Sequence, residues 1–290
     1  IPIACIGSVG YCMLFYMFMQ AVFIGAVDGS MLSNGWSGLS YPNDSGPFAG
    51  LAMALGLHWL ATLIYIDSIV TPSGSGLVYT ATTSRLVLAM SQNRFLPEHF
   101  AKLNINGVPR NAIIVNALVG IIMLAPFKGW LAIVQYQSSA IVLAYAIGPV
   151  ALISLRKNIP DHPRPFKLPY QNIFSLVTLY ICMLLVYWSG WDTVYALTVS
   201  MIIGLAIFML RIGKKELRNA LWLIPFMSII SIVSYFGHFG GTEQLPSHMD
   251  MILLFIGSCI SLYTGFKCKL GVQLSHFYLN DTSQQYYDAI

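Results

Sequence analysis

The chain has 290 residues, of which 57% are hydrophobic and only 9% are charged, and its formal net charge is +4. Because an average soluble domain has roughly 25% charged residues, a soluble fold of this length could hardly cover its surface with so few. We therefore expect the lipid bilayer as a partner, and no nucleic acid.

Long apolar stretches recur along the whole chain, and crossing the bilayer core takes about 20 mostly apolar residues in helical form. The segments 140–155 and 219–235 are apolar on almost every side, without the two-residue alternation of a membrane β-barrel. This pattern predicts an all-α, polytopic integral membrane protein with about eight transmembrane helices. In chain order, the expected spans are 3–26, 48–71, 111–127, 130–154, 172–190, 193–210, 219–236 and 250–266. The third span is short and is the weakest of these predictions.

Basic residues are concentrated on alternate connectors between the predicted spans. If the eight helices cross in turn, all of the 15 Lys and Arg residues except Lys128 fall on the same side. Positive charge near span ends is retained in the cytoplasm. Both termini are therefore expected in the cytoplasm, with the protein in the cell (inner) membrane.

The region 63–170 contains a series of short motifs. In chain order they are TPSGSG (71–76), TTSR (82–85), AMSQNRFLP (89–97), FAKLN (100–104), GVP (107–109) and RPFKLP (164–169). In order and spacing they resemble the stretch from the eighth to the eleventh transmembrane helix of the amino acid/polyamine/organocation (APC) superfamily. The opening IPIA at 1–4 resembles the start of that superfamily's seventh helix.

This resemblance implies part of an inverted-repeat, LeuT-like transporter fold and an amino acid permease that works by symport or antiport. Residues 1–210 would be the C-terminal half of the permease core, 211–270 two additional transmembrane helices, and 271–290 a cytoplasmic tail. In the superfamily the interrupted first and sixth helices hold the substrate, and this chain matches neither. The expected partners are therefore an N-terminal six-helix half and an amino acid substrate. The run 76–85 faintly resembles permeases for acidic amino acids, but the substrate does not follow from it.

Four residues of the second span are candidates for coupling an ion: Asp67, Ser68, Thr71 and Ser75. Asp67 is the acidic residue placed well inside a predicted span, where a charge costs about 2.5–3.5 kcal/mol and usually faces a partner or a water-filled path. It is either a coupling group or a carboxylate near the cytoplasmic end that serves packing. The resemblance implies ion-coordinating hydroxyls on this helix; the alternative is hydroxyls that bond their own backbone. Pro72 is expected to kink or end the helix.

Four further residues are candidates for a substrate contact or a gate. Trp59 is placed near the middle of the second span, where the resemblance implies an aromatic contact to the substrate; packing is the alternative. Gln135, Tyr136 and Ser139 lie in the outer half of the fourth span. There the superfamily's tenth helix contributes to an extracellular gate.

Enzyme chemistry is not indicated, because no HExxH, GxSxG or phosphate-cradling motif occurs. We expect no cofactor and no metal site, with a proton or sodium as the coupling ion. The five cysteines lie in or beside predicted spans and are expected to serve packing. Two alternatives to transport stay open: a non-transporting fragment of a split or decayed permease gene, and a membrane sensor or accessory protein on the same fold.

Overall fold

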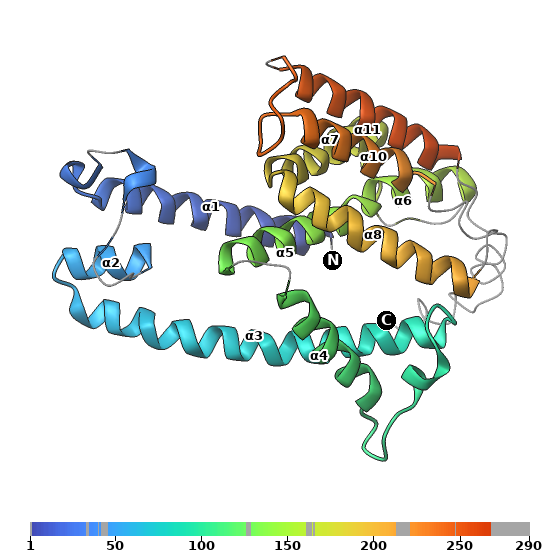
Figure 1. Cartoon of the computed structure of the whole chain (residues 1–290), viewed down its shortest axis with the longest axis horizontal. Coiled ribbons are helices and arrows are strands. Elements are labelled where there is room, and N and C mark those ends of the chain that lie inside the picture. The colour runs from blue at the N-terminus through green and yellow to red at the C-terminus, as the bar shows by residue number, and fades with distance from the viewer. Residues whose placement is uncertain are drawn as a thin grey trace. The chain divides into compact units, whose positions relative to one another are not determined.

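The structure of the chain is a computed structural model. It describes residues 2–32, 35–39, 41, 46–125, 129–160, 164, 166–212, 221–246 and 248–267. Every element in this described part is a helix (Figure 1), which confirms the all-α prediction. The chain divides into two compact units, Ile1–Ser84 and Arg85–Ile290, and each is described by itself.

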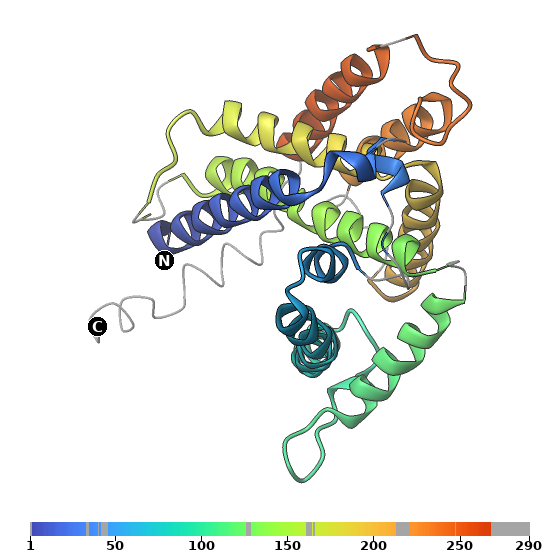
Figure 2. The ribbon, with the colours of Figure 1, turned by 90° about the vertical axis from the view of Figure 1, so that its left-hand side faces the viewer.

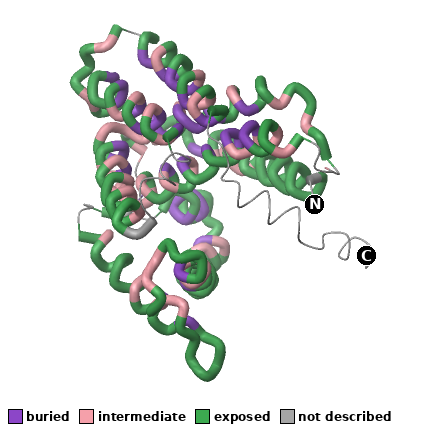
Figure 3. Tube along the Cα trace, turned by 90° about the vertical axis from the view of Figure 1, so that its right-hand side faces the viewer, coloured by how far each residue is buried: buried purple, intermediate pink, exposed green. Residues whose placement is uncertain are grey.

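The first unit has little interior of its own. Its described elements are α1 (Pro2–Ala26), η1 (Gly29–Leu32), η2 (Trp36–Gly38), α2 (Pro47–Ala54) and most of α3 (His58–Gln92). α1 agrees with the span predicted at 3–26, and none of its described side chains is buried (Figure 3). A small cluster of Val27, Tyr41 and Leu51 lies beyond the end of α1.

The span predicted at 48–71 is wrong as a single helix, because the chain breaks between α2 and α3. Gly56 has a φ of +74°, a left-handed conformation that glycine adopts without a steric penalty. The Leu57 N–H then donates to the Ala52 carbonyl at 2.8 Å, as in a Schellman helix end. Hydropathy does not detect this break, because Leu55 and Leu57 on either side of the glycine are apolar.

Of the two outcomes expected at Pro72, a kink or a helix end, the second does not occur, because α3 continues to Gln92. Proline lacks the N–H that would bond to the preceding turn, but neighbouring Ser and Thr side chains help to keep membrane helices continuous at proline. With 35 residues, α3 is about 52 Å long by the helical rise, which exceeds the roughly 30 Å of a bilayer's apolar core.

The second unit holds the larger part of the predicted spans. Its described elements after α3 are η4 (Glu98–Ala101), α4 (Arg110–Leu124), α5 (Trp130–Tyr145), α6 (Ile147–Asn158), α7 (Gln171–Trp188), α8 (Trp191–Ile212), α10 (Leu223–Phe236) and α11 (Met249–Lys267). The helix bounds of α7, α8 and α11 agree with the predicted spans within a few residues. The two helices expected after 210 lie in the same compact unit as α5 to α8.

Among the described residues, five helical stretches are long and apolar enough to cross a membrane. They are Ile3–Ala26, Leu131–Asn158, Gln171–Trp188, Trp191–Leu210 and Met249–Lys267. The apolar helices α4 and α10 are shorter, with 15 and 14 residues, or about 22 and 21 Å by the helical rise. α3 is long enough, but its Asp, Ser and Thr residues make it less apolar than these five stretches.

The stretch Leu131–Asn158 contains a break between α5 and α6. α5 ends at Tyr145, and α6 begins at Ile147. Pro149 has no N–H to donate to the Tyr145 carbonyl, which accounts for the interruption at this position. The span predicted at 130–154 is therefore two helices joined at Ala146.

The core of the second unit is centred on α7. The side chains of Leu179, Met183 and Tyr187 are fully buried there, together with Phe226 of α10 and Leu254 of α11. α10 and α11 run beside each other and against α7 (Figure 2). Burial of these large apolar side chains excludes lipid from the region where the three helices meet.

Small residues on α11 permit this close packing. Gly257, Ser261 and Gly265 recur every fourth residue on one face of the helix, and such stripes let membrane helices approach closely. A Cβ at Gly257 would overlap the Ile229 side chain of α10, and one at Gly265 would overlap Val150 of α6.

Gly257→Leu should lower the free energy of unfolding by about 1–3 kcal/mol, because extra volume in a packed interface forces neighbouring side chains and backbone to shift. The measurement is the thermal-unfolding midpoint of the purified protein in mild detergent. Gly204→Leu in α8 is the matched control, since no atom lies within 4 Å of the added Cβ there. Equal midpoints for the two variants would contradict the role of Gly257.

Candidate functional site

One side of α3 carries the four residues predicted to couple an ion. Asp67, Thr71 and Ser75 follow one another at intervals of four residues, and Ser68 is adjacent, so their positions span an arc of about 100° on the helix. The Thr71 hydroxyl donates to Oδ1 of Asp67 at 2.5 Å. The fold therefore places a hydroxyl and a carboxylate in direct contact on this face.

The hydroxyl of Ser68, unlike that of Thr71, bonds to the backbone of its own helix. It donates to the Tyr65 carbonyl at 2.7 Å, which is the backbone bonding considered as the alternative to ion coordination. Thr80 likewise donates to the Gly76 carbonyl at 2.7 Å. Thr71 differs from these residues because its bond goes to a carboxylate that can gain or lose a proton. The coupling roles of all four candidates stay predictions.

The start of α3 changes the position of Asp67 along its helix. In the span predicted at 48–71 the carboxylate would lie near the far end, whereas it is nine residues beyond His58 in the structure. That separation is about 14 Å by the helical rise, close to half of a roughly 30 Å apolar core. For a crossing that begins at His58, Asp67 lies near the middle of the bilayer.

The same shift corrects the placement of Trp59. The residue was expected near the middle of a span, but it is the second residue of α3, because Gly56 starts a new helix just before it. Its side chain is 65% exposed. Tryptophan at a helix end is typical of the membrane interface, and a contact to the substrate stays a prediction.

The predicted gate residues lie on α5, in the second unit, so the structure does not place them relative to the α3 candidates. The Tyr136 hydroxyl donates to the Ser200 hydroxyl of α8 at 2.8 Å, and Ser139 is buried. Gln135 is exposed. Tyr136 and Ser139 thus face protein, whereas Gln135 is the gate candidate accessible from outside the chain.

A buried polar pair was not predicted from the sequence. The Tyr187 hydroxyl of α7 donates to Oδ2 of Asp250 at 2.7 Å, and the Met251 N–H donates to Oδ1 at 2.8 Å. Tyr187 is fully buried, and Asp250 is 4% exposed. No local signal identifies the pair, because an acidic residue in the first turn of a helix is common and its partner is 63 positions away.

Other chemical groups do not converge in the described part of the chain. No three His, Cys, Asp or Glu side chains there could hold a metal ion. Cys182 is buried and Cys259 half-buried, but Cys5 and Cys12 are exposed. Lys128 and the predicted tail 271–290 lie outside the described residues.

Comparisons with known proteins agree with one another. A family model described as amino acid permease matches residues 1–190. The glutamate/serine transporter AimA of Bacillus subtilis (strain 168) is 33% identical over 98% of this chain and 53% of its own length. The aspartate-proton symporter of the same organism is 37% identical over 91% of this chain and 52% of its own length.

More distant relatives transport other molecules. The branched-chain amino acid permease BcaP of Bacillus subtilis (strain 168) is 26% identical over 76% of the chain and 45% of its own length. The chain thus spans about half the length of the curated relatives it matches. No solved structure matches it.

Proposed function

The chain belongs to the amino acid permease family, and on this premise we propose that it is the C-terminal part of a secondary active amino acid transporter that works by alternating access. It is an integral membrane protein and not an enzyme. The cell membrane is its proposed location, with both termini in the cytoplasm. The distribution of basic residues supports this orientation.

The proposed substrates are acidic amino acids and serine. The similarity to a glutamate/serine transporter and to an aspartate-proton symporter is the observation that carries this proposal. Both similarities extend over more than nine-tenths of this chain. They thus extend into the helices after residue 210.

Proton coupling through Asp67 is supported by the geometry of α3. A carboxylate near the middle of a bilayer is costly unless it is hydrated, paired or protonated. Thr71 donates to Asp67, so the carboxylate has a polar partner on its own helix. Sodium is the alternative coupling ion, since the Ser68 hydroxyl donates its proton to the Tyr65 carbonyl and keeps its oxygen lone pairs for a cation.

A set of N-terminal helices is the proposed partner of the first unit. The apolar side chains of α1 are exposed in this chain, among them Ile3 at 86% and Leu14 at 69%. In a membrane such surfaces are covered by lipid or by further helices. The face of α3 that carries Asp67 and Thr71 is instead expected to contact protein or water, since ionisable groups in membrane segments usually face a bundle interior or a hydrated cavity.

Co-expression with an N-terminal six-helix half should give uptake of labelled glutamate, aspartate or serine into vesicles when an inward proton gradient is imposed. A protonophore should remove the accumulation. The control replaces this chain by an unrelated membrane protein. Binding without flux would favour the sensor, and neither binding nor flux across a broad amino acid panel would contradict the transporter.

A further inference from the structure

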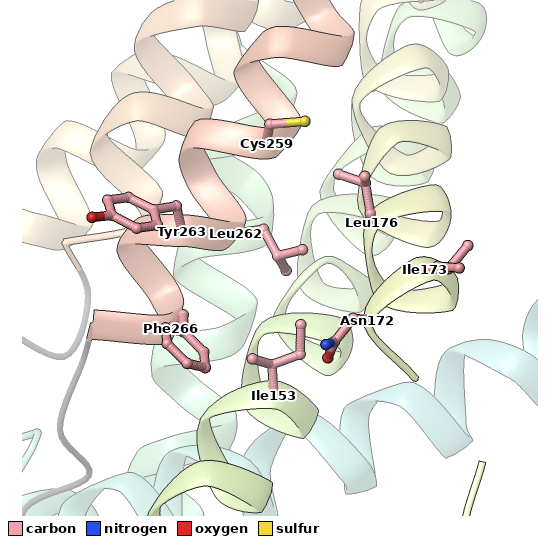
Figure 4. A pocket seen from close by; sticks show the side chains of 8 residues that line it. All are labelled: Ile153, Asn172, Ile173, Leu176, Cys259, Leu262, Tyr263 and Phe266. Atoms are coloured by element: carbon pink, nitrogen blue, oxygen red, sulfur yellow. The ribbon is translucent and has the colours of Figure 1, made fainter. Parts of the chain in front are cut away.

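An apolar groove of about 410 Å³ lies between α7 and α11. Leu176 of α7 faces Cys259 and Leu262 of α11 across it, and Ile153 of α6 lies at its base (Figure 4). The volume falls in the range of about 300–1,000 Å³ that is usual for small-ligand sites. Because no charged side chain lines it, the groove itself suits a hydrocarbon chain better than a polar solute.

Two lysines are held against the aromatic residues of this groove. Nζ of Lys157 lies 3.7 Å from the centroid of the Phe266 ring and donates to the Phe266 carbonyl at 3.1 Å. Nζ of Lys267 lies 4.5 Å from the centroid of the Tyr263 ring. Since both rings line the groove, two ammonium groups flank its end at the last turn of α11.

The neighbouring arginines, Arg156 and Arg164, donate to backbone carbonyls. Nη2 of Arg164 donates to the Ile159 carbonyl at 2.5 Å, and Nη1 of Arg156 donates to the Leu168 carbonyl at 3.3 Å. Both bonds are to backbone carbonyls between α6 and α7. Lys157 and Lys267, by contrast, are exposed and donate to no side-chain carboxylate in the described structure.

In α6, α7 and α11, the charged residues near this end of the groove are all basic. α6 and α7 contain no Asp or Glu, and the acidic residue of α11 is Asp250, at the opposite end of that helix. Basic pockets between membrane helices bind anionic lipid headgroups. An apolar groove next to such a pocket accommodates the two chemical parts of a phospholipid.

We propose that this groove is a binding site for an anionic phospholipid. One acyl chain lies between α7 and α11, and the headgroup phosphate binds Lys157 and Lys267. Asn172 lines the groove beside Ile153, where its amide can donate to an ester carbonyl (Figure 4). The proposal rests on the membrane placement of the chain and does not depend on transport.

Native mass spectrometry of the delipidated full chain, titrated with phosphatidylglycerol or phosphatidylcholine, tests the proposal. We expect at least one phosphatidylglycerol to be retained about thirtyfold more strongly than phosphatidylcholine, since each of the two lysines contributes about 1 kcal/mol toward anionic lipid. Lys157→Gln with Lys267→Gln should abolish the preference. The corresponding double Arg variant should keep it.

Matched variants separate the groove from general surface charge. Lys102→Gln removes an exposed lysine that does not line the groove and should leave the preference intact. Leu176→Phe should weaken retention by filling the groove, whereas Val177→Phe, at an exposed neighbouring position, should not. Equal retention of the two lipids, or an unchanged preference in the double Gln variant, would overturn the proposal.

A photoactivatable phosphatidylglycerol with its reactive group in the acyl chain gives a second test that needs no variant. After irradiation of the wild-type chain, peptide mapping should place adducts on α7 and α11 at residues of the groove. Adducts confined to other helices would refute the site even if anionic lipid is retained.

Discussion

Asp67→Asn should abolish uphill accumulation of the amino acid by the assembled transporter and bring it close to the background of empty vesicles. The carboxylate lies about 14 Å along α3 by the helical rise, and it is hydrogen-bonded to Thr71. Asparagine keeps the size and can still accept the Thr71 hydrogen bond, but it cannot carry a proton. The expected loss therefore concerns coupling rather than packing.

Two measurements distinguish a loss of coupling from a loss of folding. Exchange of labelled for unlabelled substrate, with no gradient imposed, should persist in Asp67→Asn because no net proton movement is needed. Asp192→Asn, which changes an exposed acid in the first turn of α8, should leave accumulation intact. Wild-type accumulation by Asp67→Asn would rule out Asp67 as the proton carrier, and accumulation driven by sodium would favour the hydroxyls of α3.

Tyr187→Phe should lower the free energy of unfolding of the second unit by about 1.5–3 kcal/mol, the usual contribution of a hydrogen bond to a charged group. The Tyr187 hydroxyl lies 2.7 Å from the Asp250 carboxylate, and Asp250 is 4% exposed. Water cannot readily replace the lost donor at such a buried site, so the carboxylate would be left short of a partner. The unfolding midpoint in detergent measures the loss.

Tyr180→Phe is the matched control on the same helix. Its hydroxyl makes a long bond of 3.4 Å to the Met251 carbonyl at an exposed position, so its removal should change the free energy of unfolding by less than about 0.5 kcal/mol. Combining Tyr187→Phe with Asp250→Asn should cost less than the sum of the two single changes, because residues in contact are not additive. Full additivity would show that the pair does not couple α7 to α11.

Local chemistry made several elements predictable. α1, α7, α8 and α11 agree closely with the spans read from hydropathy, since a long apolar run in a helix is a property of neighbouring residues. The motifs between 71 and 169 likewise pointed to the family, which the match over residues 1–190 confirms. The orientation, the ion-coupling residues and the gate stay predictions.

Elements whose bounds depend on the backbone conformation of a single residue were harder to predict from the sequence. Gly56 separates α2 from α3 inside an apolar run, so the span expected at 48–71 was too long at one end and too short at the other. The break also changes where two candidates lie along their helix, because Asp67 is nine residues beyond the start of α3 and Trp59 is its second residue. Hydropathy averages over a window and therefore cannot register one left-handed glycine.

The amino-acid sequence by itself determined the membrane class, the helical architecture and the family, because the bilayer requires long apolar helices and the motifs are local. The tertiary structure alone decided that Asp250 is paired with Tyr187, that Gly257 and Gly265 form a contact face, and that Lys157 and Lys267 flank an apolar groove. These features join residues far apart in the chain. Their partners depend on how the helices pack, which no local pattern specifies.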